Sequence, residues 1–267
     1  MSDDLVGKAQ RGDHLALEQV IRSIQDKVHH LSMRMLVNPD DAADATQEIL
    51  ILVMTKLSTF EGRSAFQTWV YRIAVNYLLT AKKISDRDLG LNFEMFQADL
   101  EAGLTTDVTT TAENDVMLNE LRIACTMAML LCLDMKHRIA YVLGDVLELD
   151  HTEAVDVLGI SKENYRKRLS RARANVLAFT STSCGLVNEN AKCSCARRLP
   201  TAITMGRIRP DHITYATKLA PTYSDVLDKT KKLETSLKTL CLQRATPPFP
   251  SPKDFGIFVA QIVEGNI

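Results

Sequence analysis

Apolar positions recur at helical spacing along most of this chain. Between Phe66 and Leu78 they fall three and four residues apart, which predicts an amphipathic helix. Its apolar stripe consists of Phe66, Trp69, Val70, Ile73, Ala74, Tyr77 and Leu78. The same spacing predicts two helices between Leu5 and Met35 and another after Asn38-Pro39, where Asn38 can cap the helix and Pro39 can occupy its first position. The pattern predicts an all-α fold.

Two polar features frame the helix that begins near Phe66. In the preceding helix Ala45, Ile49, Leu52, Val53 and Leu57 are expected to face inward, whereas the polar residues Asp41, Asp44, Gln47 and Glu48 share another face. The short loop Glu61-Gly62-Arg63-Ser64 follows, with Gly62 allowing a tight backbone and Ser64 a candidate N-cap. A basic, partly aromatic surface beside such a loop suits single-stranded nucleic acid, although a core helix with a solvated polar face has the same pattern.

The pattern changes in residues 84–115. This stretch holds eight acidic residues and one arginine, with two glycines and a threonine-rich run. Such a composition predicts a flexible acidic linker, with a short helix around Phe93 to Leu100.

A second helical unit is expected over residues 116–180. Asp150 with Glu153 forms a capping-box pattern, Gly159-Ile160 predicts a turn, and Ser161 can cap the helix that follows. In that helix the spacing turns four apolar residues towards a core, namely Tyr165, Leu169, Ala172 and Val176. Its other sides carry lysines and arginines, as a helix-turn-helix recognition helix requires. A solvated basic helix is the alternative.

Composition narrows the class of protein. The chain has 267 residues, of which 46% are hydrophobic, and a net charge of −1, as in ordinary globular proteins. No stretch approaches the ~20 consecutive apolar residues that span a bilayer, and the N-terminus lacks the apolar core of a secretory signal. We therefore expect a cytoplasmic protein without membrane insertion, in which the six cysteines are thiols or metal ligands rather than disulfides.

The order of motifs between Asp40 and Lys83 resembles the second conserved region of bacterial sigma factors of the extracytoplasmic-function (ECF) type. An acidic D-x-x-D-x-T-Q-E helix leads into an F-x-G-x-S-x-F-x-T-W-x-Y-R-I-A-x-N segment. The matching residues are Asp41, Asp44, Thr46, Gln47, Glu48, Phe60, Gly62, Ser64, Phe66, Thr68, Trp69, Tyr71, Arg72, Ile73, Ala74 and Asn76. The first unit, residues 1–83, is thereby identified as sigma region 2.

The resemblance implies two binding roles for this unit. Asp41, Asp44, Gln47 and Glu48 would dock on the clamp of the largest subunit of core RNA polymerase, although the same acids also suit a helix N-terminus. The −10 promoter element would be recognised and melted by Phe60, Arg63, Ser64, Arg72, Asn76, Lys82 and Lys83. The acidic linker would thread near the polymerase active centre, or serve as a solvated spacer.

The second unit resembles sigma region 4, which binds the −35 promoter element and the polymerase flap. The resemblance rests on Arg138, Leu143, Asp145 and Val146, on Leu158 to Ser161 and on Arg168 to Arg173. It implies DNA contacts by Ser161, Lys162, Arg166, Lys167, Ser170, Arg171 and Arg173. The chain departs from the family at Leu133-Asp134, where Leu-Pro is usual, and at residues 163–168, where G-T-V-K-S-R is usual. Tyr165, in place of a small β-branched residue, implies a reshaped core, and the altered outward residues of this stretch imply a different DNA sequence preference.

Residues 181–267 extend beyond the usual end of the family. Cys184, Cys193 and Cys195 stand close to arginines, and cationic surroundings favour a low thiol pKa, metal binding or redox reactivity. A zinc site with a fourth ligand such as His212 or Cys241, a thiol redox switch, and thiols without either role all remain open. Cys125 and Cys132 are expected to be small core residues. Some ECF sigma factors carry a cysteine-rich extension of this kind.

The end of the chain carries two more candidate helices, over Tyr223 to Leu242 and Asp254 to Val263. They could form a regulatory domain, a cap over the cysteine segment or a docking site. The interpretation overall is a sigma factor without enzymatic activity or required cofactor, and it leaves the existence of an anti-sigma partner open. A helix-turn-helix regulator that acts without polymerase is the alternative. A hydrolase or transferase is also conceivable from the cysteines and histidines, but this sequence shows no nucleophile and base at a recognisable spacing.

Overall fold

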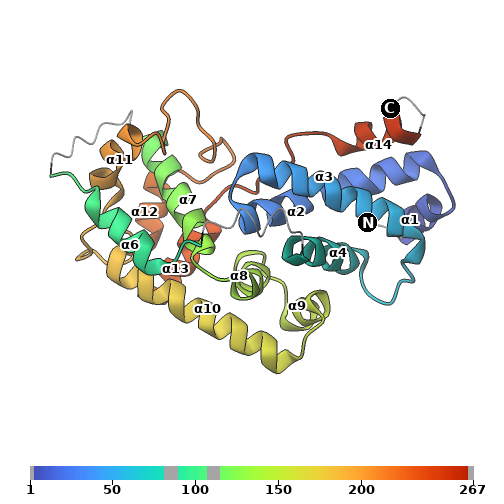
Figure 1. The fold of residues 1–267 in the computed structure, drawn as a ribbon, viewed down its shortest axis with the longest axis horizontal. Helices are drawn as coiled ribbons and strands as arrows, with labels where there is room; N and C mark the ends of the chain where they lie inside the picture. Colours follow the sequence, from blue (N-terminus) through green and yellow to red (C-terminus); the bar gives the residue numbers. More distant parts are fainter. Residues whose placement is uncertain (1–2, 81–89, 107–114, 264–267) are drawn as a thin grey trace. The chain divides into compact units, whose positions relative to one another are not determined.

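The computed structural model describes residues 3–80, 90–106 and 115–263, and within these ranges the regular structure is helical, apart from one isolated bridge between Arg209 and His212 (Figure 1). The all-α prediction is confirmed. Among the helices of these ranges, none combines the length and apolar character needed to cross a membrane.

Contacts group the chain into two compact units that interleave along the sequence. Unit 1 comprises residues 1–87, 150–165 and 249–267, and unit 2 comprises residues 88–149 and 166–248. These units differ from the four segments predicted from the sequence, which were residues 1–83, 84–115, 116–180 and 181–267. Contacts place the first helix of the helix-turn-helix and the C-terminal helix with unit 1, because each packs on a helix of that unit.

Unit 1 is a group of helices around α2 (Figure 1). Its helices are α1 (Asp3–Gln10), α2 (His14–Leu36), α3 (Pro39–Lys56), the 3-10 turn η1 (Leu57–Thr59), α4 (Phe66–Thr80), α9 (His151–Leu158) and α14 (Phe255–Val263). Asp13 caps α2 by accepting the amide of Ala16, and Asn38 caps α3. The core is apolar: Ile21, Val28 and Ile49 are fully buried.

Unit 2 is built around α7 (Asp115–Leu131). Its other elements are α6 (Phe93–Ala102), α8 (Met135–Tyr141), the π-helix η3 (Val142–Val146), α11 (Cys195–Thr204), α12 (Tyr223–Lys231), α13 (Thr235–Arg244) and the larger part of α10 (Lys162–Ser183). The helices α11, α12 and α13 all pack on α7. The C-terminal extension up to Pro248 is therefore part of the same core as residues 116–149 and 166–180 of the predicted region 4.

The prediction of a flexible linker is wrong for residues 90–106. The expected short helix is present as α6, and its Phe96 and Leu100 are buried against Met129 and Phe179. The ring of Phe96 stacks on that of Phe179 with centroids 5.2 Å apart. The few apolar residues of this acidic stretch share one helix face, so they bury together despite the low overall hydrophobicity.

Candidate polymerase-binding and nucleic-acid interface

The helix α3 carries the residues predicted to bind polymerase. Asn38 accepts the amide of Asp41 at 3.0 Å, which fixes the start of the helix. Asp44 and Glu48 are exposed one turn apart, whereas Asp41 and Gln47 are half-buried. The opposite side is buried as the spacing predicts, at Ala45, Ile49 and Val53, while Leu52 is only half-buried. Unit 1 thus presents two solvent-facing carboxylates on α3.

Tyr77 of α4 lies close to these carboxylates. Burial raises the pKa of its hydroxyl, and the negative charges of Glu48 and Asp44 raise it further. The acidic face of α3 therefore borders on α4, whose polar side carries the predicted DNA contacts.

An aromatic cluster anchors the loop between α3 and α4. The ring of Phe60 lies 5.2 Å from that of Phe66 and 5.5 Å from that of Trp69, measured between centroids. Gln10 of α1 donates to the backbone carbonyls of Leu57 and Phe60 at 3.0 and 2.7 Å. Phe60, predicted to meet a −10 base, is therefore half-buried among aromatic neighbours, and it supports the loop rather than projecting from it.

The tip of this loop is exposed. Gly62 adopts a positive φ of 70°, a conformation that glycine allows at little cost. Arg63 is 85% exposed and forms an ion pair with Glu61. Ser64, a candidate N-cap, instead donates its hydroxyl to the carbonyl of Ala65 at 3.4 Å, and α4 begins at Phe66. The loop thus offers one arginine to solvent at its tip.

Arg72, the central predicted −10 contact of α4, is bound to α9. Its Nη2 lies 2.6 Å from Oδ1 of Asp156, and its Nε donates to the Asp156 carbonyl at 3.1 Å. Asn76 is exposed one turn further along. Lys82 and Lys83 lie outside the described residues. Of the predicted −10 residues on α4, Asn76 faces solvent and Arg72 is held by a carboxylate.

The predicted helix-turn-helix turn is present. Asp150 accepts the amides of Thr152 and Glu153 at 2.7 and 2.9 Å and so caps α9. Gly159 ends α9 in the left-handed conformation, with φ 61°. Ser161 then accepts the amide of Asn164 at 3.2 Å, which confirms its predicted capping role.

The orientation predicted for α10 is confirmed. Its inward side is buried at Tyr165, Leu169, Ala172, Val176 and Phe179. The residues predicted to contact −35 DNA are exposed, namely Ser161, Lys162, Arg166, Lys167, Ser170, Arg171 and Arg173. Tyr165, the departure from the family pattern, meets the ring of His151 edge-on at 5.4 Å. The large side chain is accommodated by this contact with the first helix of the motif.

Arg173 has a structural partner among the exposed cations of α10. It forms a bidentate pair with the nearly buried carboxylate of Asp145, with Nε to Oδ2 at 2.8 Å and Nη2 to Oδ1 at 2.5 Å. Arg244 of α13 donates to the Asp145 carbonyl at 2.7 Å and pairs with Glu148. Arg173 therefore joins α10 to η3, so its guanidinium already has a structural partner within the protein.

Two further motif residues have structural roles. Arg138 is buried and donates to the carbonyls of Leu130, Leu131 and Leu133, which ends α7. Asp134, where the family usually has proline, caps α8 by accepting the amides of Lys136 and His137 at 3.0 Å. Either residue can start a helix, so the departure is neutral for the fold.

The cysteine segment does not provide reactive thiolates. The prediction that nearby arginines lower the thiol pKa values is wrong, because burial outweighs them. Burial raises the pKa of Cys193 to about 11 and that of Cys195 to about 12, and it also raises the pKa of Cys184. Cys125 and Cys132 pack beside apolar clusters, as predicted for small core residues. All these thiols are neutral at ordinary pH.

The predicted zinc site finds no support. Across residues 3–80, 90–106 and 115–263, no group of three or more His, Cys, Asp or Glu side chains could hold a metal ion. His212, a candidate fourth ligand, is exposed, whereas Cys195 packs on the apolar clusters around Leu199 and Leu186. The segment contributes to the core of unit 2.

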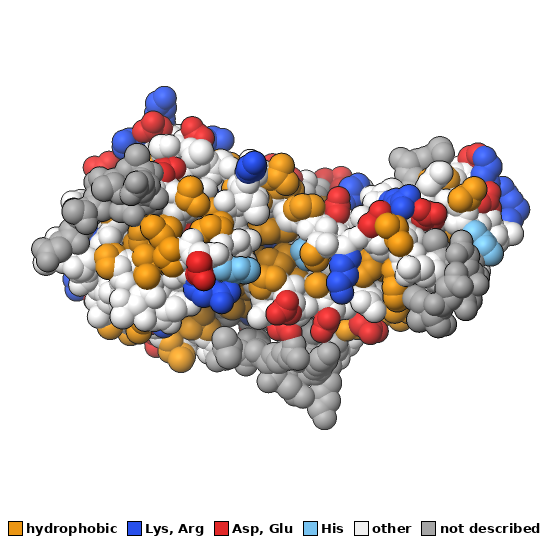
Figure 2. All heavy atoms as spheres, turned by 90° about the horizontal axis from the view of Figure 1, so that it is seen from above, with side chains coloured by type: hydrophobic (Ala, Val, Ile, Leu, Met, Phe, Trp, Pro, Cys, Tyr) orange, Lys and Arg blue, Asp and Glu red, His pale blue; other side chains and the backbone are white. Residues whose placement is uncertain are grey.

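The partners of the arginines are not evident from the sequence. Asp156 and Arg244 carry no motif, and each contacts a residue 84 or 99 positions away. Figure 2 shows acidic and basic side chains interspersed on the face that it draws. In such a mixed surface, composition alone does not indicate which carboxylate meets which arginine.

Comparisons with known proteins agree with these motifs. The Sigma-70 region 2 family matches residues 20–87. The chain is 31% identical over 175 residues to the ECF RNA polymerase sigma-E factor of Haemophilus influenzae, covering 63% of this chain and 89% of that protein. It is 28% identical over 173 residues to the ECF RNA polymerase sigma factor SigW of Bacillus subtilis, covering 63% and 90%.

A solved structure of CnrH in complex with the cytosolic domain of CnrY is also similar. It has 20% sequence identity and a TM-score of 0.48, and the match covers 66% of this chain and 95% of that one. The sequence relatives establish the family independently of this likeness. The chain belongs to the extracytoplasmic-function family of RNA polymerase sigma factors.

Proposed function

We propose that this sigma factor binds core RNA polymerase through α3, holds the −35 element with α10, and places the loop before α4 at the −10 element. It acts as a binding and DNA-melting subunit, without catalysis or a required cofactor, in the cytoplasm with the polymerase. The observation that carries the proposal is the exposed cationic face of α10 directly after a capped helix-turn-helix turn.

The acidic face of α3 supports polymerase binding. A carboxylate near a helix N-terminus can be explained by the helix dipole, but that effect fades within the first turn. Because α3 begins at Pro39, Asp41 fits this explanation whereas Glu48 does not. Asp44 and Glu48 are exposed, so a basic partner can approach them from solvent, and we propose that this partner is the clamp of the largest polymerase subunit.

The face of α10 supports binding to duplex DNA. Four cations of α10 are exposed, namely Lys162, Arg166, Lys167 and Arg171. Two exposed serines lie beside them, Ser161 at the cap of α10 and Ser170 within it. Lysine and arginine contacts to phosphates position a recognition helix, while contacts to base edges supply sequence preference. We assign −35 contacts to this set and give Arg173 the supporting role that its pair with Asp145 indicates.

The −10 role requires one rearrangement. Arg63 and Asn76 are exposed, but Arg72 is paired with Asp156. For Arg72 to hold a promoter strand, α9 must release it. A phosphate can replace the aspartate because both present oxygen atoms to the guanidinium fork.

Matched variants test this division of labour. The double change Asp44→Asn/Glu48→Gln should weaken binding to core polymerase and leave binding of the free chain to duplex DNA unchanged. The double change Lys167→Gln/Arg171→Gln should alter preference among −35 sequences and leave core binding unchanged. Fluorescence titrations with core enzyme and with labelled duplexes measure both affinities. If both variants lost the same activity, the assignment of separate surfaces would fail.

A further inference from the structure

One face of α2 presents a row of polar side chains to the end of the chain. Four residues of α2 share one side because they are spaced at i, i+3, i+4 and i+7, namely Arg22, Gln25, Asp26 and His29. We call these four residues the docking face. Each of them bonds to a residue between Phe249 and Phe255, more than two hundred positions away.

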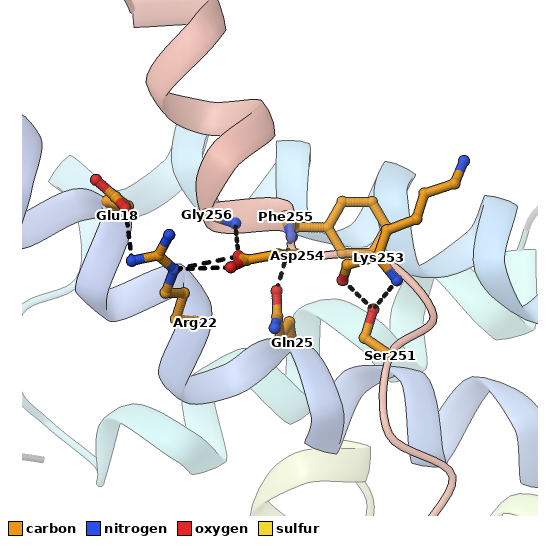
Figure 3. Close-up of polar contacts among 8 residues, drawn as sticks. All are labelled: Glu18, Arg22, Gln25, Ser251, Lys253, Asp254, Phe255 and Gly256. Atoms are coloured by element: carbon orange, nitrogen blue, oxygen red, sulfur yellow. Dashed lines mark hydrogen bonds and ion pairs between the residues drawn. The ribbon is translucent and has the colours of Figure 1, made fainter.

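The docking face binds mainly the backbone of that segment. The amide of Phe255 donates to Gln25 at 2.8 Å (Figure 3), and the amide of Ser251 donates to Asp26 at 2.9 Å. The carbonyl of Phe249 lies 2.9 Å from Nδ1 of His29. An extended segment cannot satisfy its own amides and carbonyls, so side chains of α2 do so, in the manner of a site that binds a peptide.

Three apolar side chains anchor the segment. Phe255 and Val259 are 3% and 2% exposed and lie one turn apart on α14, which packs on α2. Phe249 is buried, with its ring 5.6 Å from the ring of His30 and 5.5 Å from the guanidinium carbon of Arg34. Ile257 is 52% exposed on the outer side of α14. The segment therefore has one binding side and one solvent side.

The sequence Asp254-Phe255-Gly256 fits closely around Arg22 (Figure 3). Nε of Arg22 lies 3.1 Å from both carboxylate oxygens of Asp254, and Glu18 holds Nη1 of the same guanidinium at 2.6 Å. Asp254 also accepts the amide of Gly256 at 2.9 Å, at the start of α14. A Cβ atom on Gly256 would lie 2.6 Å from Cγ of Arg22 and 2.7 Å from its Nε. Alanine at this position would force the Arg22 side chain to shift, so the neighbour and not the backbone favours glycine here.

We propose that the docking face is a peptide-binding site and that residues 249–263, the latch, occupy it as a detachable segment of the same chain. The Arg22–Asp254 pair is solvent-exposed and therefore weak. Phe249 is held at a φ of 46°, a conformation that aromatic residues rarely adopt, so release relaxes the backbone there. Prolines at 247, 248, 250 and 252 keep the approach extended and separate α14 from α13.

The latch joins the C-terminal extension to the part of the chain that matches sigma region 2, since α2 lies largely within residues 20–87. Its binding is a property of α2 and of the segment alone. The inference therefore does not depend on the promoter-binding roles proposed above, and its tests need neither polymerase nor DNA.

The full-length Gly256→Ala variant tests the fit. Alanine normally favours a helix over glycine, so a merely local role predicts tighter protection of α14. If the latch fits around Arg22 as proposed, the substitution loosens it instead. Hydrogen–deuterium exchange of peptides covering residues 249–263 should then be at least about tenfold faster in Gly256→Ala than in the wild type, with exchange in α3 and α4 unchanged. Ile257→Ala, at the exposed position of the same helix, should leave exchange unchanged. Protection equal to or greater than that of the wild type in Gly256→Ala would overturn the proposal.

A peptide added in trans tests exchangeability. A fluorescent peptide of residues 247–263 should bind the full-length Phe255→Ala/Gly256→Ala protein and bind the wild type at least about tenfold more weakly, because the wild-type face is occupied. Adding Arg22→Asp to the opened protein should weaken binding of this peptide and favour a peptide carrying Asp254→Arg. The proposal would be overturned if the peptide did not bind the Phe255→Ala/Gly256→Ala protein, or if adding Arg22→Asp to that protein left peptide binding unchanged.

Discussion

The two units use arginine–aspartate pairs in different ways. In unit 1, Arg72 pairs with Asp156 and Arg22 pairs with Asp254, and all four side chains are at least 40% exposed. In unit 2, the pair of Arg173 with Asp145 and the pair of Arg198 with Asp99 each contain one partner that is at most 6% exposed. Exposed pairs add little to stability, whereas breaking a buried pair leaves a charge without compensation.

The difference indicates which attachments can open. In unit 1 the exposed pairs hold α9 and the latch, segments that arrive from distant parts of the sequence. In unit 2 the buried pairs fix α6 and α10 within the core around α7. We therefore expect regulated contacts in unit 1 and permanent ones in unit 2.

The largest expected effect is at Asp99. Its carboxylate accepts from buried Arg198 at 2.8 Å and also pairs with Arg207. Asp99→Ala should lower the free energy of unfolding by about 3 kcal/mol, because the guanidinium of Arg198 stays buried without its counter-charge. The matched change Asp254→Ala in unit 1 should leave urea denaturation unchanged. Equal losses in the two variants would remove the distinction between the units.

The next effect separates two arginines of α10. Arg173→Ala should destabilise the protein by about 2 kcal/mol, since it leaves the carboxylate of Asp145 buried without its partner. Arg171→Ala should leave stability unchanged and reduce the salt dependence of DNA binding by about one released counterion. Thermal denaturation and DNA titrations at several salt concentrations measure both. Similar stability losses in the two variants would contradict the structural role given to Arg173.

A smaller effect is expected at Asp156. Asp156→Asn removes the counter-charge of Arg72 while its backbone carbonyl bond remains, so it should loosen Arg72 and raise the affinity for −10 single-stranded DNA about two- to fivefold, the range that an exposed ion pair allows. Glu153→Gln is the matched control, because it removes an exposed acidic charge from the same helix without releasing Arg72. If Asp156→Asn and Glu153→Gln raised the affinity for this DNA equally, release of Arg72 would not be the cause.

The smallest expected effect is a difference in acid sensitivity. Burial lowers the pKa of His29 below its usual 6.5, and the hydrogen bond to the Phe249 carbonyl and the charge of Asp26 only partly oppose this. Neutral His29 is therefore the docked form, so its contribution to latch binding is complete above pH 6.5 and is lost as the pH falls. The second ring nitrogen is buried without a partner among the described residues, which makes an added proton costly.

Unit 2 should respond only at lower pH. The hydrogen bond from Arg207 holds the pKa of Asp99 below its usual 3.8, so that carboxylate contributes stability above pH 3.8 and loses it as the pH falls further. Hydrogen exchange corrected for intrinsic rates should show the latch loosening first, with unit 2 still protected. If the latch still loosened first on acidification in His29→Gln, a group other than His29 would be responsible for this loosening.

Local spacing predicted the parts of the structure that local physics controls. The buried side of α10, the caps at Asn38, Asp150 and Ser161, and the helix within the acidic stretch all follow from residues within a few turns of one another. Each of these features depends on helix periodicity or on one nearby hydrogen bond.

Contacts between distant residues could not be predicted in the same way. Arg22 and Asp254 are 232 positions apart, and neither belongs to a motif. The thiol pKa values of the cysteine segment could not be predicted either, because the sequence shows the neighbouring arginines but not the burial that raises these pKa values. Charge and reactivity depend on tertiary packing, which a single sequence does not display.

We propose that this chain gives core RNA polymerase its promoter specificity. The most direct measurement is transcription by purified core enzyme on a promoter-containing template, with and without the full-length chain. We expect a stable complex with core enzyme, and transcripts that start at a defined site only when the chain is present. Protection of duplex DNA by the chain alone, with no binding to core enzyme and no defined transcripts, would contradict it.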